Sequence, residues 1–96
     1  MDKQPCVYIL TNRRNGTLYT GVTSDLLKRV WEHKNKIMRG FTAKYGLDRL
    51  VWYECHETME SAIMREKAIK SLKRSWKLKA IEAMNPEWRD LYEELV

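Results

Sequence analysis

The chain has 96 residues, of which 44% are hydrophobic and 32% charged, and its formal net charge is +5. This length supports one domain with one modest hydrophobic core, and it leaves no room for a second catalytic domain or a large cofactor cradle. The longest apolar run, residues 6–10, is too short for a membrane span or for the apolar region of a secretory signal. We therefore expect a single-domain cytoplasmic protein, residues 1–96, with no membrane partner.

Positive charge is concentrated in two segments of the chain. Residues 28–49 contain seven basic and two acidic residues, and residues 61–80 contain seven basic and one acidic residue. Two concentrated basic segments are typical of proteins that bind a phosphate backbone. The acidic segment at residues 87–94 leaves open a different function, in which it would form the surface for a protein partner.

The first predicted element is a β-hairpin. Residues 6–10 and 18–22 are short runs rich in β-forming side chains, and the segment between them contains Asn15-Gly16. Both of these residues tolerate positive φ, so Asn-Gly between two apolar runs favours a tight turn.

The hairpin brings two tyrosines to one face. If residues 12–15 form the loop, Thr11 pairs with Gly16 and Tyr8 lies opposite Tyr19. Gly21 lies on the same face, where the lack of a side chain leaves space beside the ring, and glycine inside a strand usually marks a close approach by another group. The tyrosine pair is therefore either a packing feature of the hairpin or part of a site.

A helix is predicted after the hairpin, from a cap at Ser24 or Asp25 to about residue 38. Arg29 and His33 are four residues apart, so they are neighbours on the polar face of this helix. A cation beside a proton-transfer group suits phosphate chemistry, although such pairs are also common on surfaces.

The rest of the chain completes an α+β pattern. The expected elements are a basic loop with Lys44, a third strand at residues 49–55, and helices at residues 59–75, 76–84 and 87–95. This order predicts a small three-stranded antiparallel sheet flanked by helices, with a ββαβα core and further C-terminal helices.

Glu66 occupies a position in the helix at residues 59–75 where the 3.6-residue period calls for a hydrophobic side chain. A buried, unpaired carboxylate costs several kcal/mol, so Glu66 must have a partner. One possibility is an ion pair with a basic side chain such as Lys70, Arg65 or Arg29. The other is a divalent metal, and a single carboxylate suits Mg²⁺ or Mn²⁺, which keep several waters and accept phosphate oxygens.

Basic residues of the loop and of the later helices are candidates for contacts to a nucleic-acid backbone. These candidates are Lys44, Lys70, Lys73, Arg74 and Lys77. Part of this basic run is expected to be a solvated surface.

The two cysteines, Cys6 and Cys55, could form one bridge at most. Neither has a CxxC neighbour, and two histidines do not complete a tetrahedral zinc site. We expect two reduced thiols packed in strands.

A set of residues in a fixed order resembles the GIY-YIG endonuclease family. The matching residues are Tyr8, Tyr19-Thr20-Gly21, Arg29, His33, Glu66 and Asn85. The resemblance covers nearly the whole chain and points to the small stand-alone bacterial members, which are related to the N-terminal nuclease module of the excision-repair incision subunit. Two positions depart from the pattern, since Cys6 replaces the glycine of the first tripeptide and Thr20 replaces the isoleucine of the second.

The resemblance implies a metal-dependent endonuclease that hydrolyses phosphodiester bonds of DNA, in repair or recombination. Glu66 would bind a single Mg²⁺ or Mn²⁺, and Asn85 would shape the site. Arg29 would stabilise the charge that develops on the phosphate, and His33 matches a histidine found in some branches of the family.

In this interpretation Tyr19 is the general base and Tyr8 positions the attacking water. A free tyrosine is only about 0.1% ionised at pH 7, so a neighbouring cation, histidine or metal must assist it. The alternative function is a nucleic-acid-binding module with a weak or vestigial nuclease site. With either function, the nucleic acid would be recognised by its shape and charge, or through a protein partner that supplies specificity.

Overall fold

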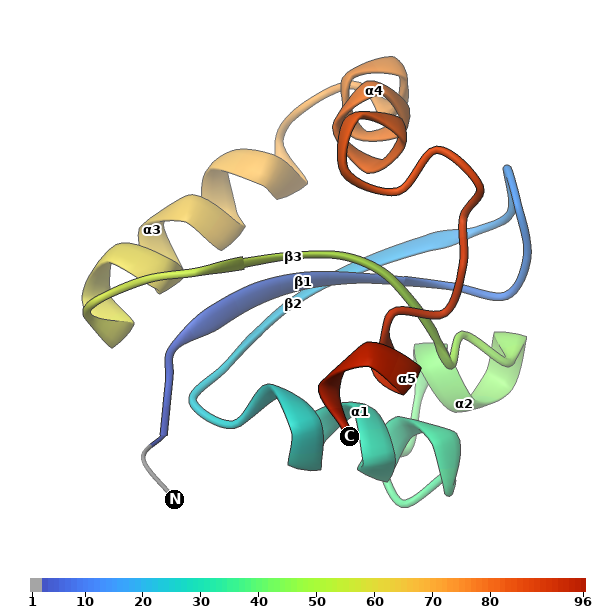
Figure 1. Ribbon diagram of the computed structural model, residues 1–96, viewed down its shortest axis with the longest axis horizontal. Coiled ribbons are helices and arrows are strands. Elements are labelled where there is room, and N and C mark those ends of the chain that lie inside the picture. Colours follow the sequence, from blue (N-terminus) through green and yellow to red (C-terminus); the bar gives the residue numbers. More distant parts are fainter. Residues whose placement is uncertain (1–2) are drawn as a thin grey trace.

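The computed structural model describes residues 3–96 as a three-stranded antiparallel sheet with helices on both faces (Figure 1). The elements in chain order are β1 (Cys6–Thr11), β2 (Leu18–Thr23), α1 (Leu26–Lys34), α2 (Phe41–Tyr45), β3 (Arg49–Cys55), α3 (Met59–Lys70), α4 (Arg74–Met84) and α5 (Tyr92–Leu95). The predicted α+β class and antiparallel sheet are confirmed. No helix of this described part is long and apolar enough to cross a membrane.

The strands lie in the order β2-β1-β3, and the β1–β2 register differs from the predicted one. Tyr8 lies opposite Gly21, and Tyr19 lies opposite Leu10, so the prediction that the two tyrosines face each other directly is wrong. The connection covers residues 12–17 and is two residues longer than expected.

Polar contacts hold this longer loop. Thr11 Oγ1 donates to the carbonyl of Thr17 at 2.8 Å, and Asn15 adopts the left-handed conformation with φ 58°. Arg74 of α4 donates to the carbonyls of Asn15 at 2.8 Å and Gly16 at 2.7 Å. Arg74, which was predicted to contact nucleic acid, therefore ties α4 to the hairpin.

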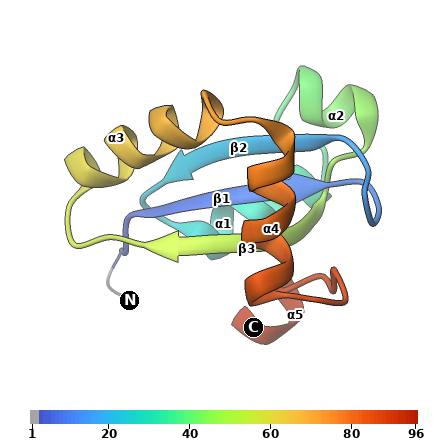
Figure 2. The same cartoon turned by 90° about the horizontal axis from the view of Figure 1, so that it is seen from above.

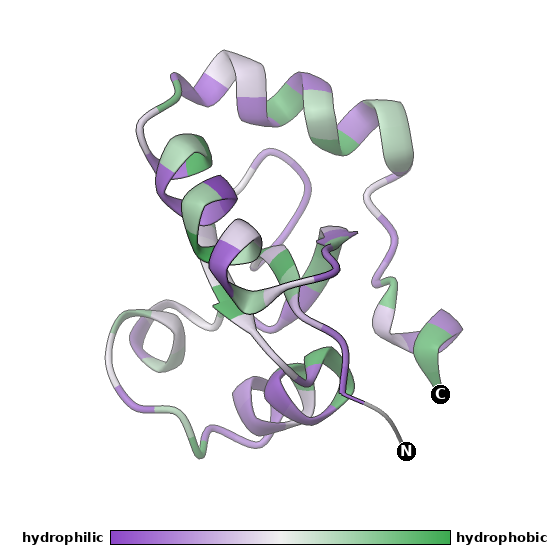
Figure 3. Cartoon of the chain, turned by 90° about the vertical axis from the view of Figure 1, so that its left-hand side faces the viewer, coloured by the Kyte–Doolittle hydropathy of each residue, from purple (hydrophilic) through white to green (hydrophobic). Residues whose placement is uncertain are grey.

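Each face of the sheet packs against its own set of helices (Figure 1). The face covered by α1, α2 and α5 buries Cys6, Tyr8, Leu10, Leu26, Val30, Leu47, Leu50 and Leu91. The face covered by α3 and α4 buries Val7, Ile9, Val51, Trp52, Ala62, Ile69, Ile81 and Trp88. Figure 3 shows hydrophobic and hydrophilic residues next to each other along the helices, and the buried ones include Val30 on α1, Ile69 on α3 and Ile81 on α4.

β3 contains a bulge next to its centre. Ile9 pairs with Trp52 and Leu10 pairs with Leu50, so Val51 has no partner in β1. The extra residue is the reason that Val51 and Trp52, although adjacent, both pack toward α3 and α4.

The helices differ from the predicted ones at their ends. α1 ends at Lys34 instead of residue 38, since Asn35 forms its C-cap and Lys36 turns into the left-handed region with φ 56°. α2, which was expected to be a loop, is a single short helix bounded by Gly40 and Gly46, both with positive φ. α3 ends at Lys70 and α5 spans four residues, so both are shorter than predicted.

The segment between α4 and α5 is irregular and is organised around Asn85. This side chain is buried, and its Nδ2 donates to the carbonyls of Val51 at 3.3 Å and Arg89 at 2.7 Å. Its Oδ1 accepts from the Arg89 backbone N–H at 3.0 Å. Asn85 therefore fastens the chain to the bulge of β3, and the buried Trp88 completes this corner.

Replacing Asn85 with alanine should lower the free energy of unfolding by about 2–3 kcal/mol, because it leaves buried backbone groups without partners. Urea denaturation measures this loss. Glu87→Ala, at an exposed position of the same segment, should change stability by less than about 0.5 kcal/mol. A loss no larger for Asn85→Ala than for Glu87→Ala would contradict the role given to these hydrogen bonds.

Candidate active site

Three aromatic rings meet on the α1 face of the sheet. Tyr8 comes from β1, Tyr19 from β2 and His33 from α1. The ring centroids are 6.3 Å apart for Tyr8 and Tyr19, 6.0 Å for Tyr8 and His33, and 5.9 Å for Tyr19 and His33. Tyr8 is fully buried and Tyr19 is half-buried, so Tyr19 is the tyrosine that a substrate can reach.

Gly21 is required because the Tyr8 ring lies directly over it. A Cβ atom at this position would lie 2.5 Å from both Cζ and the hydroxyl oxygen of Tyr8. The space expected beside the ring is therefore filled by the opposite tyrosine. The glycine lets the Tyr8 hydroxyl extend over β2, which is an edge strand of the sheet.

His33 lies on the buried side of α1, so its predicted place on the polar face is wrong. The side chain is buried, its Nε2 lies 3.2 Å from the Tyr8 hydroxyl, and its Nδ1 lies 3.1 Å from Thr42 Oγ1. The imidazole thus connects β1 to α2. Burial, assisted by the Arg29 charge, lowers the pKa of His33 below its ordinary value, so the ring is neutral at pH 7.

The Tyr8 hydroxyl stays protonated at neutral pH. Burial is the largest influence and raises the pKa of Tyr8 to about 12, although a hydrogen bond from Arg29 opposes it. The Glu66 carboxylate raises the pKa further. Tyr8 is therefore a hydrogen-bond donor and a poor base, which leaves Tyr19 as the candidate base.

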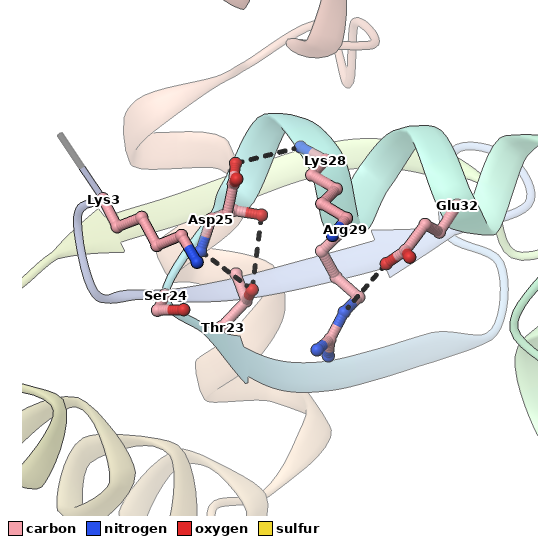
Figure 4. A pocket seen from close by; sticks show the side chains of 7 residues that line it. All are labelled: Lys3, Thr23, Ser24, Asp25, Lys28, Arg29 and Glu32. Carbon is pink, nitrogen blue, oxygen red and sulfur yellow. Dashed lines mark hydrogen bonds and ion pairs between the residues drawn. The ribbon is translucent and has the colours of Figure 1, made fainter. Parts of the chain in front are cut away.

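Arg29 extends from α1 toward β2, as Figure 4 shows. Its Nε forms an ion pair with Glu32 Oε1 at 3.5 Å. Both side chains line a hollow of about 180 Å³ at the start of α1, together with Lys3, Thr23, Ser24, Asp25 and Lys28. Two-thirds of the Arg29 side chain is covered, so its guanidinium is held in place and still meets solvent.

Glu66 reaches the same region from the opposite face of the sheet. It lies on α3 between Ala62 and Ile69, which are buried, as the helical period predicted. α3 packs against β2 and β1, and Figure 2 shows it along the β2 side. The Glu66 side chain is 13% exposed, and its Oε2 accepts from Lys70 Nζ at 2.9 Å.

A single divalent ion fits this donor set. Glu66 uses one oxygen for Lys70, whose side chain is 51% exposed, and the other oxygen is not engaged by any described residue. Residues 3–96 contain no group of three or more His, Cys, Asp or Glu side chains that could hold a metal. One carboxylate is enough for Mg²⁺ or Mn²⁺ when water and substrate phosphate complete the coordination.

Tyr8, Tyr19 and Arg29 therefore lie near Gly21 with His33 behind them, and Glu66 is near enough for its charge to raise the pKa of Tyr8. Asn85 lies elsewhere, at the bulge of β3 on the opposite edge of the sheet. Sequence reasoning missed two residues that orient the site. Glu32 could have been found as the acidic neighbour of Arg29 at i+3, whereas the contact of Thr42 with His33 depends on how α2 packs against α1.

The basic candidates are distributed over several surfaces. Lys44 on α2 and Lys73, just before α4, are exposed, and Lys77 on α4 is half-exposed. Lys70 is paired with Glu66, and Arg74 is bonded to the hairpin. Lys44, Lys73 and Lys77 are therefore the better placed candidates for phosphate contacts.

The lowered pKa of His33 predicts a pH-dependent stability. Between the folded pKa and about 6.5, the unfolded chain binds more protons, so stability falls as the pH drops from 7 to 5. Urea denaturation across this range should show a smaller slope for His33→Gln. His56→Gln, at the other histidine, should keep the part of the pH dependence that comes from His33. Equal slopes for the wild type and His33→Gln would contradict the assignment of this pH dependence to His33.

Comparisons with known proteins identify a family and several relatives for this chain. A family model described as the GIY-YIG catalytic domain matches residues 4–79. A UPF0213 protein of Staphylococcus saprophyticus is 40% identical over 85 residues, which are 84% of this chain and 96% of that protein. A UPF0213 protein of Clostridium perfringens is 39% identical over 77 residues, 80% of this chain and 82% of that protein.

A solved structure shares the fold. The solution NMR structure of a UPF0213 protein from Bacillus halodurans superposes with a TM-score of 0.56 at 28% identity, and the match covers 91% of this chain and 92% of the other. The names of these relatives state no substrate or reaction.

Proposed function

The chain belongs to the GIY-YIG family, and from this premise we propose that it is a metal-dependent endonuclease that hydrolyses phosphodiester bonds of DNA. The observation that carries the proposal is the convergence at Gly21. A buried tyrosine, an accessible tyrosine, an arginine and a carboxylate reach this edge of the sheet from both faces.

Arg29 provides the positive charge for the phosphate. Its Nε is occupied by Glu32, which leaves the terminal nitrogens for Tyr8 and for substrate oxygens. The planar guanidinium matches two phosphate oxygens, and its charge opposes the negative charge that develops during attack.

The two tyrosines have different tasks. Tyr8, with a pKa of about 12, keeps its proton and orients the attacking water or a phosphate oxygen as a hydrogen-bond donor. Tyr19 accepts the proton of that water as general base. The neutral His33 fixes the position of Tyr8 and adds no charge to the site.

Glu66 would hold the divalent ion. When bound, Mg²⁺ or Mn²⁺ supplies Lewis-acid stabilisation of phosphate and leaving-group oxygens. The ion would bind the carboxylate oxygen that Lys70 leaves free, and its charge would repel Lys70, whose exposed position lets it move away.

A nucleic-acid-binding module with a weak or vestigial nuclease site is the second candidate. The observation that favours it is that both charged groups of the site are already paired, Glu66 with Lys70 and Arg29 with Glu32. A protein partner would then supply the chemistry, and in either case a partner is the expected source of sequence specificity.

A cleavage assay separates the two functions. Purified protein is incubated with branched, single-stranded and duplex DNA in Mn²⁺, in Mg²⁺ or in chelator. The nuclease proposal predicts metal-dependent products and a loss of at least about 100-fold for Tyr19→Phe. Tyr53→Phe, a half-buried tyrosine on β3, is the matched control and should retain activity. Binding without cleavage on every substrate would favour the second candidate.

A further inference from the structure

The short helix α2 exposes two aromatic rings side by side. Phe41 and Tyr45 are 48% and 47% exposed, and their ring centroids are 4.8 Å apart at an interplanar angle of 53°. Lys44 Nζ lies 5.4 Å from the centre of the Tyr45 ring. We call Phe41, Lys44 and Tyr45 the α2 platform. Two contacting aromatic rings, each about half exposed and next to a cation, form a surface that can stack a planar ligand.

The α2 platform is anchored to the candidate active site. Thr42, which follows Phe41, bonds through Oγ1 to His33 Nδ1 at 3.1 Å, and His33 Nε2 bonds to the Tyr8 hydroxyl at 3.2 Å. Figure 2 shows α2 at the β2 edge of the sheet, and Figure 1 shows it on the same face as α1 and opposite to α3. The platform therefore has a fixed position a short distance from the tyrosines.

The charge around the platform selects the ligand. Lys36, Arg39 and Lys44 are exposed, and none of them forms an ion pair with another residue of the described chain. The chain as a whole carries +5, so a second copy would be repelled from this surface. An anionic ligand with planar groups, which is the chemistry of single-stranded nucleic acid, complements both features.

We propose that the α2 platform stacks an unpaired base of DNA whose neighbouring phosphate lies at Tyr19 and Arg29. The substrate class is then duplex DNA that carries a single-stranded segment, such as a fork, flap or overhang. This inference rests on the proposed nuclease function for the position of the phosphate. The stacking itself is a binding event that can be measured without cleavage.

The test uses forked DNA with 2-aminopurine in its unpaired arm, in the presence of chelator. The wild type should quench the 2-aminopurine fluorescence as the base stacks. Phe41→Leu/Tyr45→Leu keeps the apolar bulk of α2 and removes the rings, so it should abolish the quenching and weaken binding of forked DNA about tenfold. Binding of blunt duplex should change less than twofold, and the salt dependence should stay the same because no charge is removed.

A matched control and a second variant keep the test decisive. Trp31→Ala removes an aromatic ring of equal exposure, 47%, from the part of α1 that faces Tyr92, and it should bind forked DNA as the wild type does. Tyr45→Ala alone serves if the double variant fails to fold. Unchanged quenching and affinity in a folded platform variant would overturn the proposal. Dimerisation that the platform substitutions abolish would also overturn it.

The outcomes separate this inference from the nuclease function. If the platform variant cleaves every substrate as the wild type does, the stacking proposal is wrong and the nuclease proposal stands. If quenching depends on the platform but no metal supports cleavage, the platform stands and the nuclease proposal fails.

The two cysteines carry an independent inference. Cys6 of β1 and Cys55 of β3 lie directly opposite each other, and their sulfur atoms are 3.2 Å apart. The adjacent pair is hydrogen-bonded, His56 N–H to Pro5 carbonyl at 2.8 Å, so the cysteines occupy the closer, non-hydrogen-bonded type of position. Cys6 is buried and Cys55 is exposed, and both are free thiols as expected.

We infer that this pair is a modification site for low-molecular-weight disulfides. The Cys55 thiolate attacks one sulfur of the reagent, whose S–S bond breaks and releases one thiol. The Cys6 sulfur, after losing its proton to solvent, attacks Cys55 Sγ and releases the second thiol. Two protein thiols are oxidised to one disulfide as the reagent is reduced to two thiols.

The order of attack follows from burial. Burial and the neighbouring Cys55 raise the pKa of Cys6 to about 12, so Cys6 is a poor first nucleophile. Mass spectrometry after treatment with oxidised glutathione should show the wild type with two hydrogens fewer and no glutathione. Cys6→Ser should stop with one glutathione on Cys55, and Cys55→Ser should react much more slowly. A wild type that keeps glutathione, or remains fully reduced, would overturn this inference.

Discussion

Replacing Glu66 with glutamine should lower the kcat of metal-dependent cleavage by about 10²–10³-fold. Glutamine has almost the same shape, so packing between Ala62 and Ile69 is retained. The amide cannot supply the negative charge that binds a divalent ion. The rate is measured with a labelled DNA substrate over a range of Mn²⁺ concentrations.

Two controls show whether this loss comes from the metal or from the ion pair. Glu60→Gln alters an exposed carboxylate of the same helix and should leave the rate unchanged. Lys70→Gln removes the partner of Glu66 and should lower the Mn²⁺ concentration that gives half-maximal rate. Equal losses in Glu66→Gln and Lys70→Gln would instead assign Glu66 to the ion pair.

Adding one methyl group at Gly21 should disrupt both the fold and the site. The new Cβ would lie 2.5 Å from Tyr8 Cζ and from its hydroxyl oxygen, so the ring must move away from Arg29 and His33. We expect a loss of about 1–3 kcal/mol in the free energy of unfolding, as for overpacked cores. Cleavage should fall at least tenfold at temperatures where the variant is still folded.

A second substitution isolates the clash. In a Tyr8→Val background the ring is absent, so Gly21→Ala should be neutral or stabilising, because alanine restricts the unfolded chain more than glycine does. Urea denaturation of the four proteins measures the interaction energy. Additive losses would show that the Tyr8 ring is not the reason for glycine at this position.

Successive side chains of a strand lie on alternate faces of the sheet, and this made part of the site predictable. The hairpin register differs from the predicted one by two residues, and a shift of two keeps every side chain on its original face. Tyr8, Tyr19 and Gly21 therefore share a face as predicted, although their partners differ. Glu66 was predictable for a similar reason, since a carboxylate in an apolar stripe stands out at any helix length.

Burial on α1 could not be predicted from periodicity. Trp31 is the more hydrophobic residue, yet it is 47% exposed, whereas His33 is buried. Two hydrogen bonds of the His33 side chain, with Tyr8 and with Thr42, decide which side of α1 faces the core. These partners lie 25 and 9 residues away, and no local pattern contains them.

The C-terminal segment shows the same limit. A helix from residue 87 was expected, but Trp88 adopts φ 57° and is fully buried, and Asn85 is hydrogen-bonded across to β3. Burial of a large ring and three side-chain hydrogen bonds outweigh helix propensity over a few residues. The convergence of Arg29 and Glu66 from opposite faces also depends on tertiary packing, and only their residue types pointed to it.

We propose that Glu66, Tyr8, Tyr19 and Arg29 form one metal-dependent site at the β2 edge. An anomalous difference map from crystals soaked in Mn²⁺ tests it most directly. We expect a peak on the Glu66 carboxylate, on the side that faces the two tyrosines, with Lys70 displaced from its 2.9 Å contact. An intact Glu66–Lys70 pair without a peak, at a Mn²⁺ concentration that saturates any cleavage, would contradict it.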